Sequence, residues 1–209
     1  MITIEFNEVR QSFYGRHIFG PLTAQLKSGQ ITAVTGANGS GKSTFLKLAG
    51  HLLRPAQGTV TVKTESGELT QAALRQHLAM VTPELRFYDR LTARENMAFF
   101  LGLRGLSLTE AVYRKILDRV ELPASAADHV YTGEFSTGMR QRLKMAVLLA
   151  CQADIWLLDE PGANLDEAGR AMVAREVQAA AAQNVLVALA TNDPGEEALA
   201  HACIALAGD

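Results

Sequence analysis

The chain has little of what marks secreted or nucleic-acid-binding proteins. It contains 2 cysteines in 209 residues, and its net charge at pH 7 is −2. Cys151 and Cys203 stand far apart in apolar surroundings, without metal-ligand spacing, so we expect both to be buried structural thiols in a reducing compartment. The small net charge gives no global signal for a nucleic-acid backbone, and no nucleic-acid partner is expected.

Long apolar runs are also missing. The N-terminus, MITIEFNEVR, has no charged start followed by an apolar core, so we expect that it is not a signal peptide. Runs such as MAVLLA and VLVALA are far shorter than the ~20 residues that cross a bilayer. We therefore expect a soluble, cytoplasmic protein, and any membrane-spanning part would belong to another chain.

The composition is that of an ordinary globular protein, with 48% apolar and 20% charged residues. Residues 2–35 alternate with period two and predict strands, whereas residues 84–150 predict three amphipathic helices, two of them preceded by a threonine that can cap. Short, uniformly apolar strands then return and suit a parallel sheet buried on both faces. We predict one domain over 1–209, with an α/β core (1–83 and 151–209) and a mainly helical insertion at 84–150.

A glycine-rich loop follows an apolar run in AVTGANGSGKSTFLKLAG, residues 33–50. Residues 36–43 satisfy the pattern G-x-x-x-x-G-K-[ST], in which glycines let successive N–H groups face an anion. The helix that starts near Lys42 adds its positive end. Lys42 would reach the β- and γ-phosphates, and the Ser43 hydroxyl would hold Mg²⁺. The alternative is a glycine-rich turn before an ordinary helix, but the flanking strand and helix favour a nucleoside triphosphate site.

An acidic pair ends the apolar strand in DIWLLDEP. A carboxylate at the carboxyl end of a strand lies where ligands bind in an open α/β sheet. Asp159 would take Mg²⁺ through water, and Glu160 could polarise the attacking water. Alone, such a pair is usually a solvated loop; the phosphate loop upstream favours the functional interpretation.

A small polar turn, Ser136, Thr137 and Gly138, begins the helix in FSTGMRQRLKMAVLLA, immediately before that strand. A helix start of this kind is a second candidate anion site. It is so close in sequence to Asp159 that it is better suited to a nucleotide held by another chain than to the one at Lys42.

Together these motifs resemble the ATP-binding-cassette ATPases over essentially the whole chain. The loop at 36–43 is similar to their Walker A motif, IWLLDE to Walker B, ANLD at 163–166 to the D-loop, and FSTGM loosely to the LSGGQ signature. The resemblance implies a P-loop NTPase core with a mainly parallel sheet flanked by helices, an N-terminal antiparallel β subdomain and an inserted helical subdomain with the signature loop. It also implies a head-to-tail dimer that holds two ATP molecules between Walker A and signature loops.

The resemblance further implies ATP and Mg²⁺ as cofactors. Tyr14 stands where the family has an aromatic that stacks on adenine; the alternative is a core aromatic at a strand end. The implied nucleotide contacts are Tyr14, Gly36, Ala37, Asn38, Gly39, Ser40, Gly41, Lys42, Ser43, Thr44, Ser136 and Gly138. The implied catalytic residues are Lys42, Glu160 and Asn192, and the implied metal ligands are Ser43, Asp159 and Glu84.

Besides Thr137 and Met139 in the signature-like turn, two switch positions depart from the family pattern. The family carries a glutamine before the helical block, where Glu84 stands here, or Pro83 if the gap differs by one. Glu84 could approach Mg²⁺ but adds negative charge beside the γ-phosphate; the alternative is a solvated acid in a loop. The family's γ-phosphate histidine is replaced by Asn192, which cannot carry a charge. Hydrolysis is therefore expected to be slow.

The function implied first is the ATPase subunit of a transporter, acting with a second copy or a related subunit on separate transmembrane permease subunits. It would lie peripherally on the inner face of the cell membrane. Phe87 and Tyr88 are candidates for the partner surface, whereas Phe99 and Phe100 are expected in the helical core. The alternatives are a soluble cassette ATPase for complex assembly, an ATP sensor with weak turnover and, less favoured, a P-loop kinase.

Overall fold

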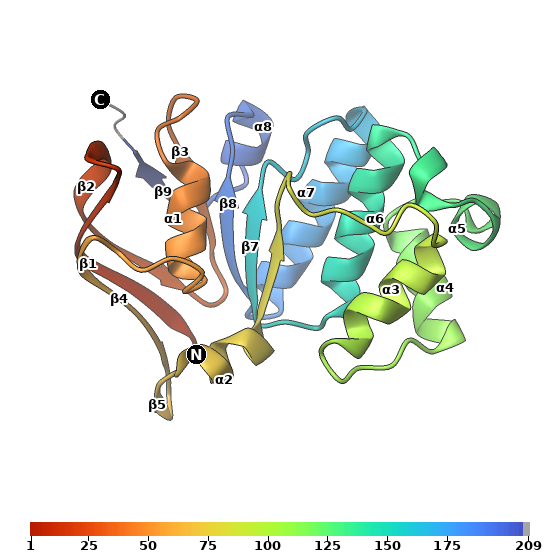
Figure 1. Cartoon of the computed structure of the whole chain (residues 1–209), viewed down its shortest axis with the longest axis horizontal. Helices are drawn as coiled ribbons and strands as arrows, with labels where there is room; N and C mark the ends of the chain where they lie inside the picture. The colour runs from red at the N-terminus through yellow and green to blue at the C-terminus, as the bar shows by residue number, and fades with distance from the viewer. Residues whose placement is uncertain (207–209) are drawn as a thin grey trace. The chain divides into compact units, whose positions relative to one another are not determined.

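The computed structural model describes residues 1–206, which form two compact units (Figure 1). The first unit contains Met1–Met80, Asp154–Glu160 and the chain from Val177 onward. The second contains Val81–Ala153 and Pro161–Glu176. None of the helices within residues 1–206 combines the length and the apolar composition that a membrane span requires.

An antiparallel sheet forms one layer of the first unit. Its strand order is β2-β1-β4-β5. The inward positions of the long first strand, Ile4 and Phe6 among them, are buried, and exposed residues interrupt them, as the period-two pattern predicts. The strands are β1 (Thr3–Phe13), β2 (Arg16–Lys27), β4 (Gln57–Thr64) and β5 (Gly67–Glu68).

The second sheet of this unit has the order β6-β7-β8-β3-β9, and β3, β7, β8 and β9 pair in parallel. Every residue of β7 and β8 is buried, as expected for parallel strands covered on both faces. The prediction of an α/β fold with a parallel sheet is confirmed. The strands are β3 (Ile31–Thr35), β6 (Leu78–Val81), β7 (Ile155–Asp159), β8 (Leu186–Ala190) and β9 (Ala202–Ala205).

Helix α1 (Lys42–Ala49) joins the two sheets of the first unit. Figure 1 shows it between the antiparallel strands and β8. The Phe45 ring stacks on Phe6 of β1 with ring centroids 4.3 Å apart, and Leu46 and Leu48 are fully buried in the same hydrophobic cluster. This packing fixes the helix that follows the glycine loop.

Helices make up most of the second unit: α3 (Ala93–Gly102), α4 (Glu110–Arg119), α5 (Ala124–His129), the 3₁₀ turn η1 (Thr132–Glu134), α6 (Thr137–Ala150) and the start of α7 (Glu167–Ala182). Thr92 and Thr109 cap α3 and α4, as predicted, because each hydroxyl accepts a hydrogen bond from an N–H of the first turn. Thr92 also forms a capping box with Glu95.

A buried amide fixes the loop that precedes α3. Asn96 is fully buried, and its Oδ1 accepts from the Tyr88 N–H at 2.9 Å. Its Nδ2 donates to the carbonyl oxygens of Tyr88, at 3.2 Å, and Thr92, at 3.0 Å. The backbone at Tyr88 is thereby attached to the first turn of α3.

The structure differs from the sequence-based expectations in its short helices and in one of the two thiols. The patterns did not indicate α2 (Gln71–His77), α5 or α8 (Pro194–Glu197), because helices this short bury one or two side chains and show no periodicity. The expectation that both thiols are buried is wrong for Cys203, which is exposed because β9 is an edge strand. Cys151 is buried, and burial raises the pKa of its thiol.

Candidate functional site

Strand register brings three chain segments to one edge of the parallel sheet. Ala190 of β8 pairs with Val34 of β3 on one side and with Asp159 of β7 on the other. The chain then leaves all three strands at the same level, since Thr191 N donates to Val34 O and Glu160 N donates to Ala190 O. The glycine loop, the acidic pair and the segment with Asn192 therefore begin side by side.

The glycines of the loop are required by its backbone. Gly36, Gly39 and Gly41 have φ values of 145°, 84° and 96°, which side-chain-bearing residues rarely adopt. A Cβ on Gly36 would lie 2.5 Å from the Leu206 carbonyl oxygen, and one on Gly41 would lie 2.6 Å from a methyl group of Ile18. The loop is tightly packed at its two ends, whereas a Cβ on Gly39 would meet nothing within 4 Å.

This difference predicts unequal costs for alanine substitutions. Gly36→Ala should destabilise the protein by about 2–5 kcal/mol, because it adds steric overlap to the strain of a positive φ. Gly39→Ala should cost only the strain, about 1–2 kcal/mol. Urea unfolding of the two variants measures both values. Equal losses in the free energy of unfolding would mean that the residues around Gly36 move to accept the added methyl group without destabilising the protein.

The first turn of α1 has the groups that a phosphate requires. The N-cap residue of α1, Gly41, makes no side-chain cap, so the first-turn N–H groups receive no capping oxygen from it. Lys42 is only 6% exposed, and its Nζ donates to the carbonyl oxygens of Gly36 (2.8 Å) and Ala37 (3.2 Å). Ser40 Oγ is buried without a hydrogen-bond partner in the described part of the chain. These donors fit a phosphate chain.

The other residues of the loop are arranged around this turn. Ala37, Asn38 and Gly39 form an exposed tip, and Ser43 and Thr44 are half-buried in α1. The tip contacts the end of β8, because Asn192 Nδ2 donates to Asn38 Oδ1 at 2.6 Å. The structure thus brings Asn192, predicted from the family position, to the glycine loop.

The acidic pair divides into a buried and a half-buried carboxylate. Asp159 is 3% exposed at the last position of β7. Glu160 follows it with a φ of 49°, a strained value for a residue with a side chain, and is half-buried. The turn at Glu160 directs the chain away from the sheet at the level of the glycine loop.

Tyr14 lies at the turn between β1 and β2 and is fully exposed. The alternative of a core aromatic is therefore wrong. An exposed aromatic ring is available to stack on a base, and its role as an adenine contact stays a prediction.

Side chains alone supply few ligands for a metal ion. In residues 1–206 no group of three or more His, Cys, Asp or Glu side chains is placed to hold one. Ser43 and Asp159 of the first unit offer one hydroxyl and one carboxylate, which suits Mg²⁺, an ion that keeps several waters and binds phosphate oxygens as well. Glu84 is an exposed residue of the second unit, and its role as a ligand stays a prediction.

The signature-like turn opens α6 in the second unit. Ser136 is the exposed N-cap residue, and its Oγ accepts from Met139 N at 3.1 Å. A Cβ on Gly138 would lie 3.4 Å from the Asn164 carbonyl oxygen, so the D-loop-like segment packs against this turn.

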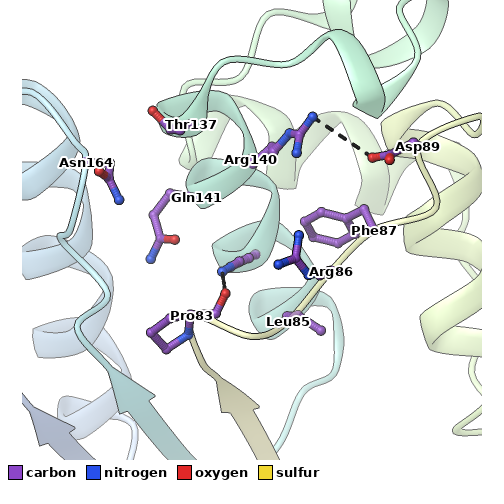
Figure 2. Close-up of a pocket in the computed structure, with 10 residues that line it drawn as sticks. Pro83, Leu85, Arg86, Phe87, Asp89, Thr137, Arg140, Gln141 and Asn164 are labelled. Atoms are coloured by element: carbon purple, nitrogen blue, oxygen red, sulfur yellow. Dashed lines mark hydrogen bonds and ion pairs between the residues drawn. The ribbon is translucent and has the colours of Figure 1, made fainter.

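A pocket of about 250 Å³ in the second unit was not foreseen from the sequence. Its walls are the segment from Pro83 to Asp89, the first two turns of α6 and Asn164 (Figure 2). Lys144 lies in this wall with 8% of its surface exposed, and its Nζ donates to the carbonyl oxygens of Thr82 (2.8 Å) and Pro83 (3.2 Å). The sequence did contain a sign of this site, because a lysine stands among the apolar residues in the second half of α6.

The sequence is similar to one family of known proteins. A family model described as "ABC transporter" matches residues 19–163. The cytochrome c biogenesis ATP-binding export protein CcmA of Bradyrhizobium diazoefficiens is 35% identical over 184 residues, which cover 85% of this chain and 86% of that protein. CcmA of Salmonella typhi is 32% identical over 179 residues, covering 86% and 84%.

Solved structures share the fold. The dimeric structure of MJ0796, described as a bacterial ABC transporter cassette, has a TM-score of 0.84 and 23% identity and covers 97% of this chain and 94% of its own. The same cassette in a post-hydrolysis state with ADP and Pi has a TM-score of 0.83 and 22% identity, with the same coverage. Because the family model spans most of the chain and two relatives exceed 30% identity over a similar length, the chain belongs to the ABC transporter family and is an ATPase of that family.

Proposed function

We propose that the chain is the ATP-hydrolysing subunit of a transporter and works as a dimer around two ATP molecules. The observation that carries this proposal is the shared register of β3, β8 and β7. It places the loop with Lys42, the amide of Asn192 and the carboxylates of Asp159 and Glu160 at one sheet edge.

Each of these residues has a distinct role in the proposal. Lys42 and the N–H groups of α1 hold the β- and γ-phosphates. Ser43, and Asp159 through water, would hold Mg²⁺, which would supply positive charge beside those phosphates. Glu160 orients and polarises the water that attacks the γ-phosphate. Tyr14 stacks on the adenine ring.

The dimer is proposed because the signature-like turn is a candidate anion site that is better suited to a nucleotide held by a second copy of the chain. Ser136 is the exposed N-cap residue of α6, and Gly138 in its first turn is half-buried. In the proposed head-to-tail dimer, this turn of one copy closes over the ATP held by Lys42 of the other. MJ0796, which shares the fold, is described as dimeric.

The proposed partner is a transmembrane permease subunit at the inner face of the cell membrane. Tyr88 and Phe99 are 52% and 38% exposed. Their rings pack edge to face, with ring centroids 4.8 Å apart. The expectation that Phe99 packs the helical core is therefore wrong, and it joins Tyr88 in an exposed aromatic surface. Because the CcmA relatives are named for export in cytochrome c biogenesis, we infer an export step of that process as the task.

Turnover is proposed to be slow, because Asn192 replaces a residue that can carry charge. Asn192→His should raise kcat by roughly tenfold, since a charge-assisted hydrogen bond to the transferring group is about twice as strong as a neutral one. Steady-state hydrolysis of purified parent and variant measures this. As a control, Asn184→His alters an amide in the turn before β8, at the opposite end of the strand. An unchanged kcat in Asn192→His would show that Asn192 does not limit turnover.

The experiment that tests the proposed function compares the purified parent with Glu160→Gln in a hydrolysis assay and on a sizing column with and without Mg-ATP. Hydrolysis by the parent and an ATP-dependent dimer of the variant support the proposal. Tight ATP binding without turnover in either chain would favour an ATP sensor. Co-purification with a membrane protein separates the remaining alternative: turnover and dimerisation without a co-purifying membrane protein would favour a soluble assembly ATPase.

A further inference from the structure

The pocket of about 250 Å³ in the second unit collects positively charged side chains. Arg86, Arg140 and Lys144 all line it. Asp89 adds a carboxylate, and Figure 2 shows both arginines in the wall that also contains the Phe87 ring. Charges of one sign that line a concave surface attract ions of the opposite sign. The lining therefore suits an anion better than a cation or an apolar molecule.

Backbone oxygen atoms hold two of these cations in place without neutralising them. Lys144 is 8% exposed, and its Nζ donates to the carbonyl oxygens of Thr82 and Pro83. Arg140 Nη2 donates to the Gly133 carbonyl oxygen at 2.8 Å. Because carbonyl groups carry no net charge, the positive charge of both side chains remains. Because both side chains are fixed before a ligand arrives, little side-chain entropy is lost on binding.

Nearby carboxylates offset this positive charge only in part. Asp89 Oδ1 lies 4.0 Å from Arg140 Nη2, and the Asp89 side chain is 73% exposed, so their attraction is weak. Burial lowers the pKa of Lys144; Glu84, which is not a lining residue, opposes that shift, and Arg86 adds to it. Three cations thus stand against two carboxylates, and positive charge remains in excess.

Arg140 also has a donor that lacks an acceptor. Its Nε is buried and has no hydrogen-bond partner within the part of the chain that the structure describes. A buried donor without an acceptor destabilises the folded chain, so such a group indicates a bound water or ion. An oxyanion in the pocket can accept from this N–H, and the planar guanidinium suits such an acceptor.

We propose that this pocket binds a tetrahedral oxyanion, either inorganic phosphate or the phosphate group of a small metabolite. Arg86 comes from the loop before α3, whereas Arg140 and Lys144 belong to successive turns of α6. A tetrahedral ion presents oxygen atoms in several directions and can accept charge-assisted hydrogen bonds from donors on two elements. All the lining residues belong to the second unit, so the site shares no residue with the glycine loop.

The test is a calorimetric titration of the whole chain with inorganic phosphate at constant ionic strength. It is made in a Lys42→Met background, so that the glycine loop contributes little to the binding. Arg86→Gln and Arg140→Gln should each weaken phosphate binding at least about tenfold, because each removes a charged donor. Asp89→Asn should strengthen it at least about twofold, because it removes a negative charge. Arg90→Gln, at an exposed arginine of the same segment outside the lining, is the matched control and should leave the affinity unchanged.

Glycerol phosphate is titrated beside the free ion to identify the source of the oxyanion. Tighter binding of the ester supports a phosphorylated metabolite, and tighter binding of inorganic phosphate supports the free ion. Absence of saturable binding, or binding that Arg86→Gln, Arg140→Gln and Asp89→Asn all leave unchanged, would overturn the inference. Should Arg140→Gln lower Tm, the exposed Arg86 still decides the matter. The titration requires neither ATP binding nor turnover, so its outcome is independent of the proposed function.

Discussion

The Glu160→Gln variant is expected to hydrolyse ATP at least about a hundredfold more slowly than the parent, because a positioned general base contributes that much or more. The amide has the shape of the carboxylate but cannot accept a proton from water. Binding should be retained, since the phosphate contacts come from Lys42 and the turn that opens α1. Steady-state phosphate release measures the first quantity and nucleotide titration measures the second.

Glu68→Gln is the matched control, because Glu68 is an exposed carboxylate on β5 of the same unit. It should leave hydrolysis unchanged. Glu160→Gln should also run as a dimer on a sizing column with Mg-ATP, since slow hydrolysis preserves the nucleotide that holds two copies together. Hydrolysis at the parental rate in Glu160→Gln, from a preparation free of contaminating ATPases, would remove Glu160 from the catalytic assignment.

The Lys42→Met variant is expected to lose at least about a hundredfold in ATP affinity, because it removes charge-assisted hydrogen bonds from a water-poor site. Methionine keeps the apolar stem that is buried beside the loop. Isothermal titration with ATP measures the loss.

Lys47→Met controls for the substitution itself, because Lys47 lies on the same helix and is half-buried. Its ATP affinity should stay within about threefold of the parental value, as is usual for a group outside the ligand contacts. Because Lys42 also donates to Gly36 and Ala37, Tm should be recorded for both variants. A Lys42→Met protein that keeps its Tm and binds ATP normally would exclude Lys42 as a phosphate contact.

The sequence predicts those parts of the fold that depend on local patterns. The continuous apolar stretches that become β7 and β8 indicate buried parallel strands, and the threonines before α3 and α4 indicate their starts. The glycine loop is recognisable because its positive φ values demand glycine at fixed positions.

Other features depend on contacts between distant parts of the chain, and local patterns do not contain them. Lys144 lies 62 residues from the Thr82 carbonyl that it binds, and Asn192 lies 154 residues from Asn38. The exposure of Cys203 follows from the position of β9 at the sheet edge. The exposure of Phe99 depends on which face of α3 the rest of the second unit covers. Only the assembled structure shows these relationships.

The amide of Asn96 has a consequence for any protein that docks on the aromatic surface of the second unit. Because this buried side chain bonds both the N–H and the carbonyl of Tyr88, that backbone cannot shift relative to α3 without leaving buried polar groups unsatisfied. The backbone that carries the Tyr88 ring is therefore held rigidly. The entropy of ordering this loop is lost when the chain folds rather than when a partner arrives, so more of the contact energy is left to hold the complex together.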